Sequence, residues 1–597
     1  MLRQRSDSDA CRGTSDYWGC EIMVRTVMAS PVTFDLTNYI ETMRSAFTIS
    51  WKEHVRHWDG PVVLVYRGTV VFPEDYLHRL LAVCGRNSAA TAHCVYWRAP
   101  DGSACIGIGA AVDTTVSGDL RFADVKQVIA EHPAHPATNE TTGHGSDVAA
   151  KWFVGGAFAV QSRHAPWTHW SDARAILPEF LFEQTADGRQ TLSCQVVFEQ
   201  GDMEENIPTI LHSVEGRLGL LVEQAKRLDG AVVDATNTEM GSSTTATTAP
   251  PATTTAATAT SGTAWLAATA TSATTSANAA LLTPVSPPDE SRAFLTAVAD
   301  TAADIRARKY TKAVLARRAV VNRAEEMTVD RVVPRLEAQN RETFVFAFRA
   351  DEEWFVGASP ERLVQLSGGE VAVDCLAGTT SRSNDAAADE QLGAELLAST
   401  KDRDEHHVVV RWVTENLAGL VDDLEFRTAP TLKKLRNVQH LWTAVSGRVR
   451  QGANVLDLVD RLHPTPAVAG RPRDVALEVI AEREQMDRGW YAGPIGWVDS
   501  RGDGEFAVAL RSALFTETEV HLYAGAGIMG DSKPESEWRE TALKLRAMQA
   551  AIAPHDDTVN ETVATAVDES VSTAVAESAH GERVNQAAPH TRAGDDQ

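Results

Sequence analysis

Cysteine is scarce in this 597-residue chain, and its few copies follow no recognisable pattern. The seven cysteines are odd in number, and no two of them form a Cys-x-x-Cys pair. Disulfide-stabilised secreted domains and structural zinc sites both depend on closely spaced cysteines, so neither is expected. The sequence therefore predicts reduced thiols and a cytoplasmic protein.

Long apolar runs are also absent. No run of about eighteen consecutive apolar residues occurs, so no membrane-spanning helix is expected. The first residues are polar and lack the apolar core of a secretory signal. Residues 1–30 are therefore predicted to be a disordered leader.

Basic residues are outnumbered, since 56 Lys and Arg stand against 81 Asp and Glu, which gives a formal net charge of −25. Such a charge repels nucleic acids and anionic membranes, so neither is an expected partner. Two interpretations of the charge remain open. One is a halophile-like protein adapted to high salt, where screening removes the self-repulsion, and the other is an ordinary acidic protein with acidic tails.

Two segments lack the apolar residues that a core needs. Residues 234–288 are almost entirely Thr, Ala and Ser, and residues 555–597 are acidic and rich in Ala and Thr. Neither can bury enough apolar surface to offset its ordering entropy, so a disordered linker and a disordered tail are predicted. The folded protein should then consist of an N-terminal α+β half, residues 31–233, and a C-terminal half, residues 289–554.

Short strand-like runs alternate with helical segments in both halves. Strands are predicted at PVVLVY, KWFVGGAFAV, TKAVLARRAVV, FAVALRSALF and VHLYAGAGI, with a hairpin turning through residues 350–353. Helices are predicted over residues 207–228, 386–420, 472–482 and 533–552, the last one starting at a capping box of Ser532 and Glu535. This mixture predicts an α+β fold with two layered antiparallel sheets and flanking helices.

The last predicted helix carries Glu537, Glu540 and Lys544 on one face, because they are spaced at i, i+3 and i+7. A solvated face with a Glu540–Lys544 ion pair is the ordinary explanation of that spacing. A site is favoured here because the helix follows the glycine-rich YAGAGI segment, where a turn would expose backbone N–H groups.

Further charged residues occur where a site could form. Glu405 lies within a long helical stretch, Glu361 follows an apolar strand at a Ser-Pro turn, and Lys312 begins another apolar strand. His406 and His407 flank Glu405, but adjacent histidines point to different helix faces and suit a transition metal poorly. Carboxylate oxygens favour Mg²⁺ instead.

These segments resemble the chorismate-utilising enzymes. That family includes isochorismate synthases, salicylate synthases and the synthase components that make anthranilate and aminodeoxychorismate. The resemblance covers residues 290–553 and, more loosely, 33–230. The motifs that carry it, in the family's order, are TKAVLAR, GASPERL, LAGT, KDRDEH, VQHLW, LHPTPAVAGRPR, YAGPIGW, ALRSA, YAGAGI and EWRETALK.

The resemblance implies a reaction in which water adds at C2 of chorismate while hydroxide leaves from C4. Lys312 matches the general base that activates the water, and Glu361 matches the general acid that protonates the departing hydroxyl. Lys312 would then need a lowered pKa, from burial or from Arg317 and Arg318. Glu361 would need a raised pKa, which an apolar pocket provides.

The resemblance also implies a Mg²⁺ ion and a pocket for a dicarboxylate. Glu405 and Glu540 match the metal ligands, with Glu537 nearby, directly or through water. An ordinary packed core role remains an alternative for His440 and Tyr491. The positions that match substrate-binding residues are Gly378, Thr379, His440, Tyr491, Arg511, Gly525, Gly527 and Lys544.

Two positions separate the branches of the family. The anthranilate-forming enzymes carry Gln at the position of Lys312, and the aminodeoxychorismate type carries Lys at that of Ala377. The chain thus resembles an isochorismate synthase, an isomerase with no glutamine amidotransferase partner, and menaquinone biosynthesis is the expected pathway. A salicylate synthase, for which Val468 and Tyr491 leave room, and an aminating enzyme remain the alternatives.

Overall fold

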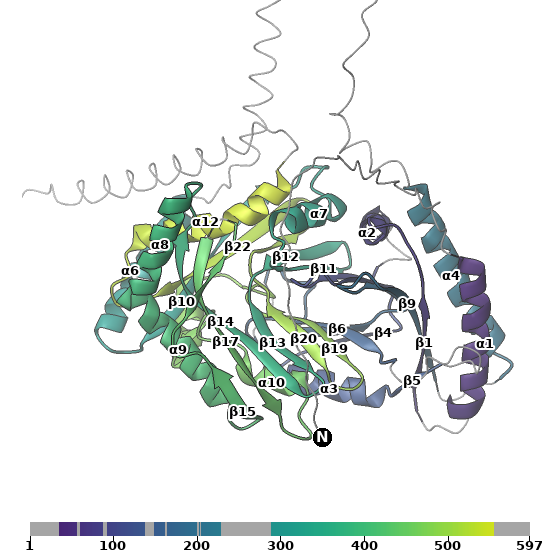
Figure 1. Ribbon diagram of the computed structural model, residues 1–597. Coiled ribbons are helices and arrows are strands. Elements are labelled where there is room, and N and C mark those ends of the chain that lie inside the picture. Colours follow the sequence, from purple (N-terminus) through teal and green to yellow (C-terminus); the bar gives the residue numbers. More distant parts are fainter. Residues whose placement is uncertain are drawn as a thin grey trace, which may run out of the picture.

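The computed structural model describes residues 35–55, 60–86, 92–137, 148–160, 164–199, 202, 204–228, 288–436 and 438–553. They form an α+β structure of two layered, mostly antiparallel sheets flanked by helices, as the sequence predicted (Figure 1). The predicted leader, the predicted tail and all but the last residue of the predicted linker lie outside the described residues.

The larger sheet has twelve strands in the order β18-β10-β22-β21-β12-β11-β2-β3-β8-β9-β1-β5. Neighbouring strands pair antiparallel, apart from the parallel pair β1 and β5. Their bounds are β1 (Val62–Thr69), β2 (Cys94–Arg98), β3 (Ala104–Ile108), β5 (Ala134–Pro136), β8 (Phe180–Gln184), β9 (Gln190–Phe198), β10 (Lys312–Asn322), β11 (Phe344–Ala350), β12 (Glu353–Ser359), β18 (Gly470–Arg471), β21 (Ser512–Phe515) and β22 (Glu519–Ile528).

The smaller sheet has ten strands in the order β15-β17-β14-β13-β20-β19-β6-β7-β4, with β16 also paired to β17. Both sheets combine strands from the two halves of the chain, because β11 pairs with β2 and β19 pairs with β6. The strands of the smaller sheet are β4 (Val112–Val116), β6 (Lys151–Gly156), β7 (Ala173–Leu177), β13 (Arg362–Ser367), β14 (Glu370–Ser381), β15 (Val421–Phe426), β16 (Thr431–Lys434), β17 (Val438–Val449), β19 (Pro494–Asp499) and β20 (Gly504–Val508).

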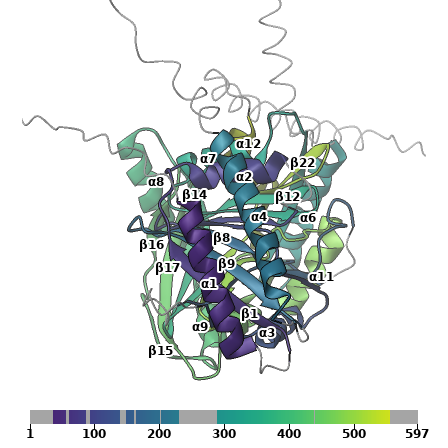
Figure 2. The ribbon, with the colours of Figure 1, turned by 90° about the vertical axis from the view of Figure 1, so that its right-hand side faces the viewer.

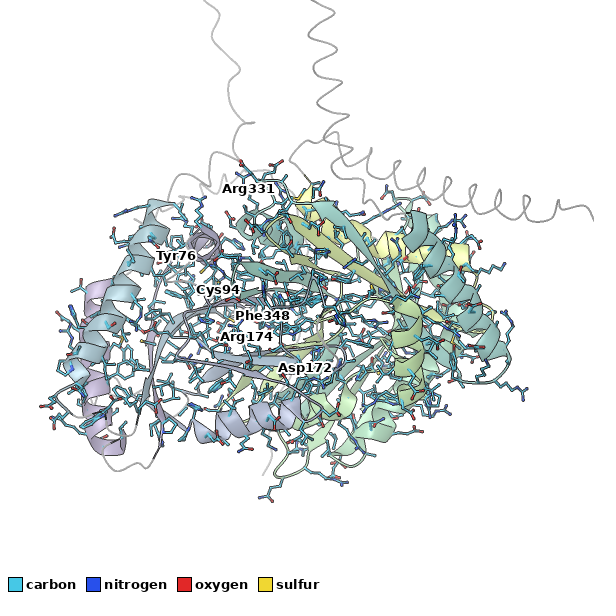
Figure 3. All side chains as sticks on the ribbon, turned by 180° about the vertical axis from the view of Figure 1, so that it is seen from behind. Tyr76, Cys94, Asp172, Arg174, Arg331 and Phe348 are labelled. Carbon is cyan, nitrogen blue, oxygen red and sulfur yellow. The ribbon has the colours of Figure 1, made fainter. Side chains whose placement is uncertain are left out.

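Strand β11 shows how the core is divided. Alternate side chains of a strand point to opposite faces of its sheet, and every residue of β11 is buried. Phe346 and Phe348 belong to the core that also contains residues of the smaller sheet, whereas Val345 and Ala347 belong to the core beneath the outer helices. Figure 3 shows Phe348 deep inside the molecule and Arg331 at its surface.

Helices cover the outer faces of both sheets. In Figure 2, α1 and α4 lie side by side across the N-terminal part of the larger sheet. None of the described helices is long and apolar enough to cross a membrane. The helices are α1 (Leu36–His54), α2 (Tyr76–Arg86), α3 (Arg121–Glu131), α4 (Ile207–Arg227), α6 (Pro288–Arg306), α7 (Val329–Gln339), α8 (Ala386–Ala398), α9 (Thr400–Leu417), α10 (Val455–Leu462), α11 (Arg473–Glu484) and α12 (Pro534–Ile552).

Two predicted elements are interrupted in the structure. The helix predicted over 386–420 is two helices, α8 and α9, because Ser399 leaves the helical conformation and its side chain accepts the backbone N–H of Asp402. The strand predicted from FAVALRSALF is also two strands, β20 in the smaller sheet and β21 in the larger. The chain changes sheets at Arg511, whose positive φ of 50° a continuous strand cannot contain.

Two local predictions around α12 are wrong. The strand predicted at VHLYAGAGI is confirmed as β22, which pairs with β10 as far as Ile528, so the turn also expected within YAGAGI is not formed. The capping box is absent, since α12 begins after Lys533 with Pro534 in its first turn and no side-chain cap. Ser532 accepts the backbone N–H of Met529 instead, and proline needs no cap for the N–H that it lacks.

Candidate active site

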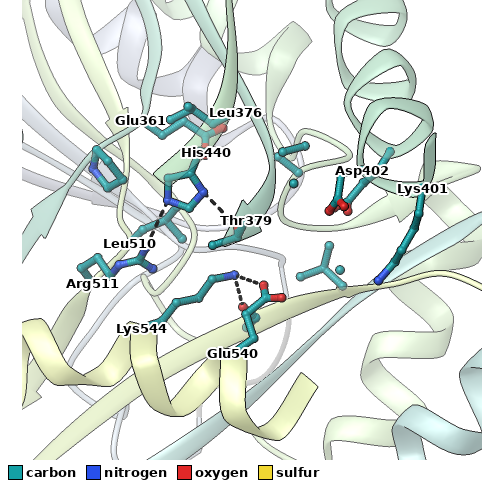
Figure 4. Close-up of a pocket in the computed structure, with 18 residues that line it drawn as sticks. Glu361, Leu376, Thr379, Lys401, Asp402, His440, Leu510, Arg511, Glu540 and Lys544 are labelled. Atoms are coloured by element: carbon teal, nitrogen blue, oxygen red, sulfur yellow. Dashed lines mark hydrogen bonds and ion pairs between the residues drawn. The ribbon is translucent and has the colours of Figure 1, made fainter. Parts of the chain in front are cut away.

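A pocket lies between the two sheets (Figure 4). The larger sheet contributes residues of β10 and β22, the smaller sheet those of β14 and β17, and helices α9 and α12 add charged side chains. The lining residues are Val314, Pro360, Glu361, Leu376, Ala377, Gly378, Thr379, Lys401, Asp402, Glu405, His440, Ala467, Leu510, Arg511, Gly525, Gly527, Glu540 and Lys544.

The structure brings most of the predicted site residues to this pocket. Lys312, Tyr491 and Glu537 do not line it, although each contacts or neighbours a residue that does. The predicted residues that line it are Glu361, Gly378, Thr379, Glu405, His440, Arg511, Gly525, Gly527, Glu540 and Lys544.

Lys312 is fully buried at the first position of β10, and its Nζ donates to Glu405 Oε1 at 2.9 Å. Both side chains pack on Gly527, where a Cβ atom would lie 2.6 Å from Glu405 Oε1 and 3.2 Å from Lys312 Cε. The glycine is therefore required by this ion pair. The charged group bonded to Lys312 is thus a carboxylate, and Arg317, one of the two arginines expected near Lys312, lies over the Trp538 ring at 3.8 Å.

Glu361 is buried at the turn between β12 and β13, and burial raises its pKa to about 8. The negative charge of Asp374 adds to this increase, while Lys433, Lys312 and Lys544 oppose it. Glu361 is therefore protonated at neutral pH and able to donate a proton into the pocket, as its predicted role requires.

Arg511, His440 and Thr379 form a chain of hydrogen bonds along one wall (Figure 4). Burial, followed by the charges of Arg511 and Lys544, holds the pKa of His440 well below its ordinary value. The neutral ring must accept at Nε2, which lies 3.4 Å from Arg511 Nη2, because a guanidinium only donates. Nδ1 then donates to Thr379 Oγ1 at 2.9 Å. The wall thus presents the positive charge of Arg511 beside a neutral ring.

Thr379 reaches this wall because β14 bulges between Ala377 and Thr379. Gly378 occupies the bulge with a φ of 80°, a conformation that favours glycine. A Cβ atom there would also lie 3.0 Å from Asp402 Cβ. The LAGT motif therefore places a strand bulge, rather than a regular strand, against helix α9.

Lys544 points into the pocket from α12. Its Nζ donates to the carbonyl oxygen of Gly525 at 2.8 Å and to Glu540 Oε1 at 2.7 Å. The ion pair expected from the i, i+4 spacing is thus present, but on a half-buried face beside β22. Gly525 offers its carbonyl to Lys544, and the predicted turn with exposed N–H groups is not formed.

Tyr491 lies behind the pocket wall. Its ring stacks on that of Tyr523 with centroids 5.3 Å apart, and burial raises its pKa to about 12. A Cβ atom on Gly525 would lie 3.2 Å from the Tyr491 hydroxyl oxygen. Tyr491 thus supports β22 from behind as a neutral side chain.

The predicted metal ligands gather carboxylate oxygens in one region but do not converge on one point. Among the described residues, no three His, Cys, Asp or Glu side chains are close enough together to hold a metal ion. Burial raises the pKa of Glu537 to about 7, with Glu540 and Glu405 adding to the increase and Lys401 opposing it. Burial also raises the pKa of Glu405, but Lys312, Lys401 and Lys544 outweigh it, so the net shift is downward.

Two charged lining residues were missed by the sequence prediction. Lys401 and Asp402 belong to the same KDRDEH motif as Glu405, and Lys401 precedes Glu405 by one helical turn. That spacing was a usable signal. Lys401 Nζ lies 3.7 Å from Glu537 Oε1, and it links α9 to α12.

Fold and pocket together define an enzyme-type site for a small anionic molecule, with basic side chains, carboxylates and one protonated glutamate enclosed between two sheets. Comparison with known sequences gives the family. The chain belongs to the chorismate binding enzymes, whose family model matches residues 76–246 and 231–553.

Individual relatives agree with the family. The salicylate biosynthesis isochorismate synthase of Pseudomonas aeruginosa is 44% identical over 264 residues, which cover 44% of this chain and 55% of the relative. The isochorismate synthase MenF of Bacillus subtilis is 40% identical over 259 residues, covering 43% and 55%. The matched stretch thus spans little more than half the length of these relatives.

A solved structure supports the fold. The menaquinone-specific isochorismate synthase MenF from Escherichia coli superposes with a TM-score of 0.56 at 22% identity, covering 85% of this chain and all of that one. At this identity the likeness concerns the fold alone.

Proposed function

We propose that this chain is an isochorismate synthase, an isomerase that converts chorismate to isochorismate. The observation that carries the proposal is a protonated glutamate on the pocket wall, Glu361, together with the fully buried Lys312, which is bonded to the lining residue Glu405. The names of the relatives with 40–44% identity support it.

Each group has a role in balancing the reaction. In its neutral amine form, Lys312 accepts a proton from water, whose oxygen forms the new bond to C2 of the ring. The ring double bond shifts, the bond from C4 to its hydroxyl oxygen breaks, and Glu361 transfers its proton to that oxygen, so water leaves. Arg511 and Lys544 bind the two carboxylates of the substrate, and the guanidinium suits a bidentate contact.

We also propose that Glu405 and Glu540 would hold Mg²⁺, with Glu537 nearby, directly or through water. Carboxylate oxygens are the donors that Mg²⁺ prefers. The negative charges of Glu405 and Glu540 also raise the pKa of Glu537, which shows that the three carboxylates repel one another. A divalent cation would relieve that repulsion. When bound, it would neutralise one substrate carboxylate and orient it.

The water branch of the family is favoured over the aminating branch by two positions. Lys312 stands where the anthranilate type has Gln, and Ala377, which lines the pocket, stands where the aminodeoxychorismate type has Lys. We therefore expect no glutamine amidotransferase partner.

We propose a cytoplasmic location, and we propose menaquinone biosynthesis as the pathway, which the name of the Bacillus subtilis relative, MenF, supports. The name of the Pseudomonas aeruginosa relative favours a second candidate, the supply of isochorismate for salicylate.

Product analysis tests the proposal. Purified protein is incubated with chorismate and Mg²⁺ at low and at high salt, without ammonium, and the products are separated by chromatography. Isochorismate in a mixture with remaining chorismate is expected. Salicylate with pyruvate would place the chain in the lyase branch, and turnover only after addition of ammonium would contradict the roles given to Lys312 and Ala377.

A further inference from the structure

A group of three side chains lies behind Glu361, outside the residues so far given a role. Asp374 of β14 accepts Trp442 Nε1–H at 2.9 Å and lies 3.4 Å from Lys433 Nζ. Lys433, from β16, also donates to the carbonyl oxygen of Pro360 at 2.7 Å. Since Pro360 immediately precedes Glu361, Lys433 bonds the turn that carries the acid to the strand that carries Asp374.

Strand register makes this group continuous with the pocket wall. Leu376, two residues after Asp374 and therefore on the same face of β14, lines the pocket and pairs with Trp442 of β17. Lys433 pairs directly with His440, which also lines the pocket. The three side chains thus extend the face of the smaller sheet that forms the pocket.

All three side chains are largely enclosed. Asp374 is 9% exposed and the Lys433 side chain 19% exposed. Burying a carboxylate is costly unless it is hydrogen-bonded and paired, and Trp442 and Lys433 provide both for Asp374. The carboxylate of Asp374 is therefore hydrogen-bonded and paired where it lies close to Glu361.

We propose that Asp374, Lys433 and Trp442 form a support behind Glu361, which fixes the Pro360–Glu361 turn against β14 and keeps a negative charge next to the carboxyl that must carry a proton. The proposal rests on the proposed function in so far as Glu361 is the acid of the reaction. Asp374 and Lys433 are positioning residues here, because they act through Glu361 and not on the substrate.

The charges around Glu361 determine the direction of each effect. Asp374 of β14 favours the protonated form, while Lys433 of β16, Lys312 of β10 and Lys544 of α12 favour the ionised form. Arg511, between β20 and β21, also interacts with Glu361. His440 of β17 is neutral, and so does not alter the balance as the pH changes.

Asp374 and Lys433 should therefore have opposite effects on the proton affinity of Glu361. An acid must be protonated to act, so activity falls as the pH rises through its pKa. Asp374→Asn removes the neighbouring negative charge and should move this alkaline limb of kcat/KM to lower pH by roughly 1 unit. Lys433→Met should move it to higher pH, with a lower kcat because the turn is released.

Three further variants separate charge from structure. Asp374→Glu retains the charge, so the alkaline limb should return to the wild-type pH. Trp442→Phe removes a hydrogen bond but no charge, so its shift should be smaller than that of Asp374→Asn. Glu370→Gln, which removes an exposed carboxylate at the start of β14, should leave the limb unchanged.

The experiment combines pH profiles of chorismate turnover with a titration that needs no turnover. The infrared band of the protonated Glu361 carboxyl, assigned by its loss in Glu361→Gln, is followed against pH in the full-length wild type, Asp374→Asn and Lys433→Met. Opposite shifts of the two variants are expected. Equal titration in all three, or shifts in one direction, would overturn the inference. If the wild type forms no isochorismate, the proposed function fails, while the infrared titration still decides the inference.

Discussion

Replacing Glu361 with Gln should abolish turnover and yet make the protein more stable at neutral pH. The pKa of Glu361 rises from an ordinary 4.5 to about 8 because the side chain is buried and Asp374 is near. Because the pKa of Glu361 is higher in the folded state than in the unfolded state, the contribution of Glu361 to the unfolding free energy is complete below pH 4.5. This contribution is lost as the pH rises towards 8. The glutamine side chain of the variant cannot ionise in either state, so the variant avoids this loss.

The size of the effect follows from proton linkage. At about 1.36 kcal/mol per pH unit, the difference in unfolding free energy between variant and wild type should grow by roughly 2.5 kcal/mol from pH 5 to pH 7. It should level off near pH 8. At roughly 2.1 cal/mol/K of unfolding entropy per residue, over roughly 430 described residues, this corresponds to a relative shift in Tm of roughly 3 °C.

Thermal unfolding of both proteins at half-unit steps from pH 5 to pH 8.5 measures this difference. Glu517→Gln is the matched control, since Glu517 is exposed and its replacement should change Tm by the same amount at every pH. A Tm difference between Glu361→Gln and wild type that stays constant with pH would refute the buried, protonated state of Glu361.

Other predictions concern the Lys312–Glu405 ion pair, the glycine that packs against it, and the proposed metal ligand Glu540. Lys312→Met should cost about 3–5 kcal/mol of stability by leaving Glu405 buried and unpaired, and in a double-mutant cycle Glu405→Gln should recover most of it; additive losses would contradict the ion pair. Gly527→Ala should reduce kcat/KM by about 100-fold, because its Cβ meets Glu405 Oε1 at 2.6 Å. Gly525→Ala, whose Cβ meets nothing closer than 3.2 Å, should reduce kcat/KM less, so an equal loss of kcat/KM in both variants would reject the argument. Glu540→Gln should raise the Mg²⁺ concentration needed for half-maximal activity, and an unchanged Mg²⁺ titration would exclude Glu540 as a ligand.

Much of the fold could be predicted from the sequence because strands have short, regular signals. The alternating apolar residues of TKAVLARRAVV and the FVFAFRADEEWFV hairpin correspond to β10, β11 and β12. The interruptions were missed since each depends on one residue: the Ser399 side chain caps a new helix, and Arg511 turns the chain from one sheet to the other. Neither changes the local apolar pattern.

The fate of the YAGAGI segment shows a different limit. The sequence VHLYAGAGI predicts a strand, but the two alanines and two glycines of its last six residues also suit a turn, and pairing with β10 along the whole segment makes it a strand. Pairing with a strand about 200 residues earlier in the chain cannot be inferred from local propensity. The same holds for Ser532, whose hydroxyl accepts the backbone N–H of Met529 and does not cap the backbone of α12.

By itself, the sequence determined which chemical groups are available and roughly where each stands along a strand or helix. Motif order and residue type indicated Lys312, Glu361, Glu405 and Lys544 as functional groups. Only the tertiary structure decided their partners, because ion pairing and burial depend on distances between elements far apart in the chain. Lys312 is bonded to Glu405, and Glu361 is protonated by its burial beside Asp374, two facts that depend on how β10, β14 and α9 pack together.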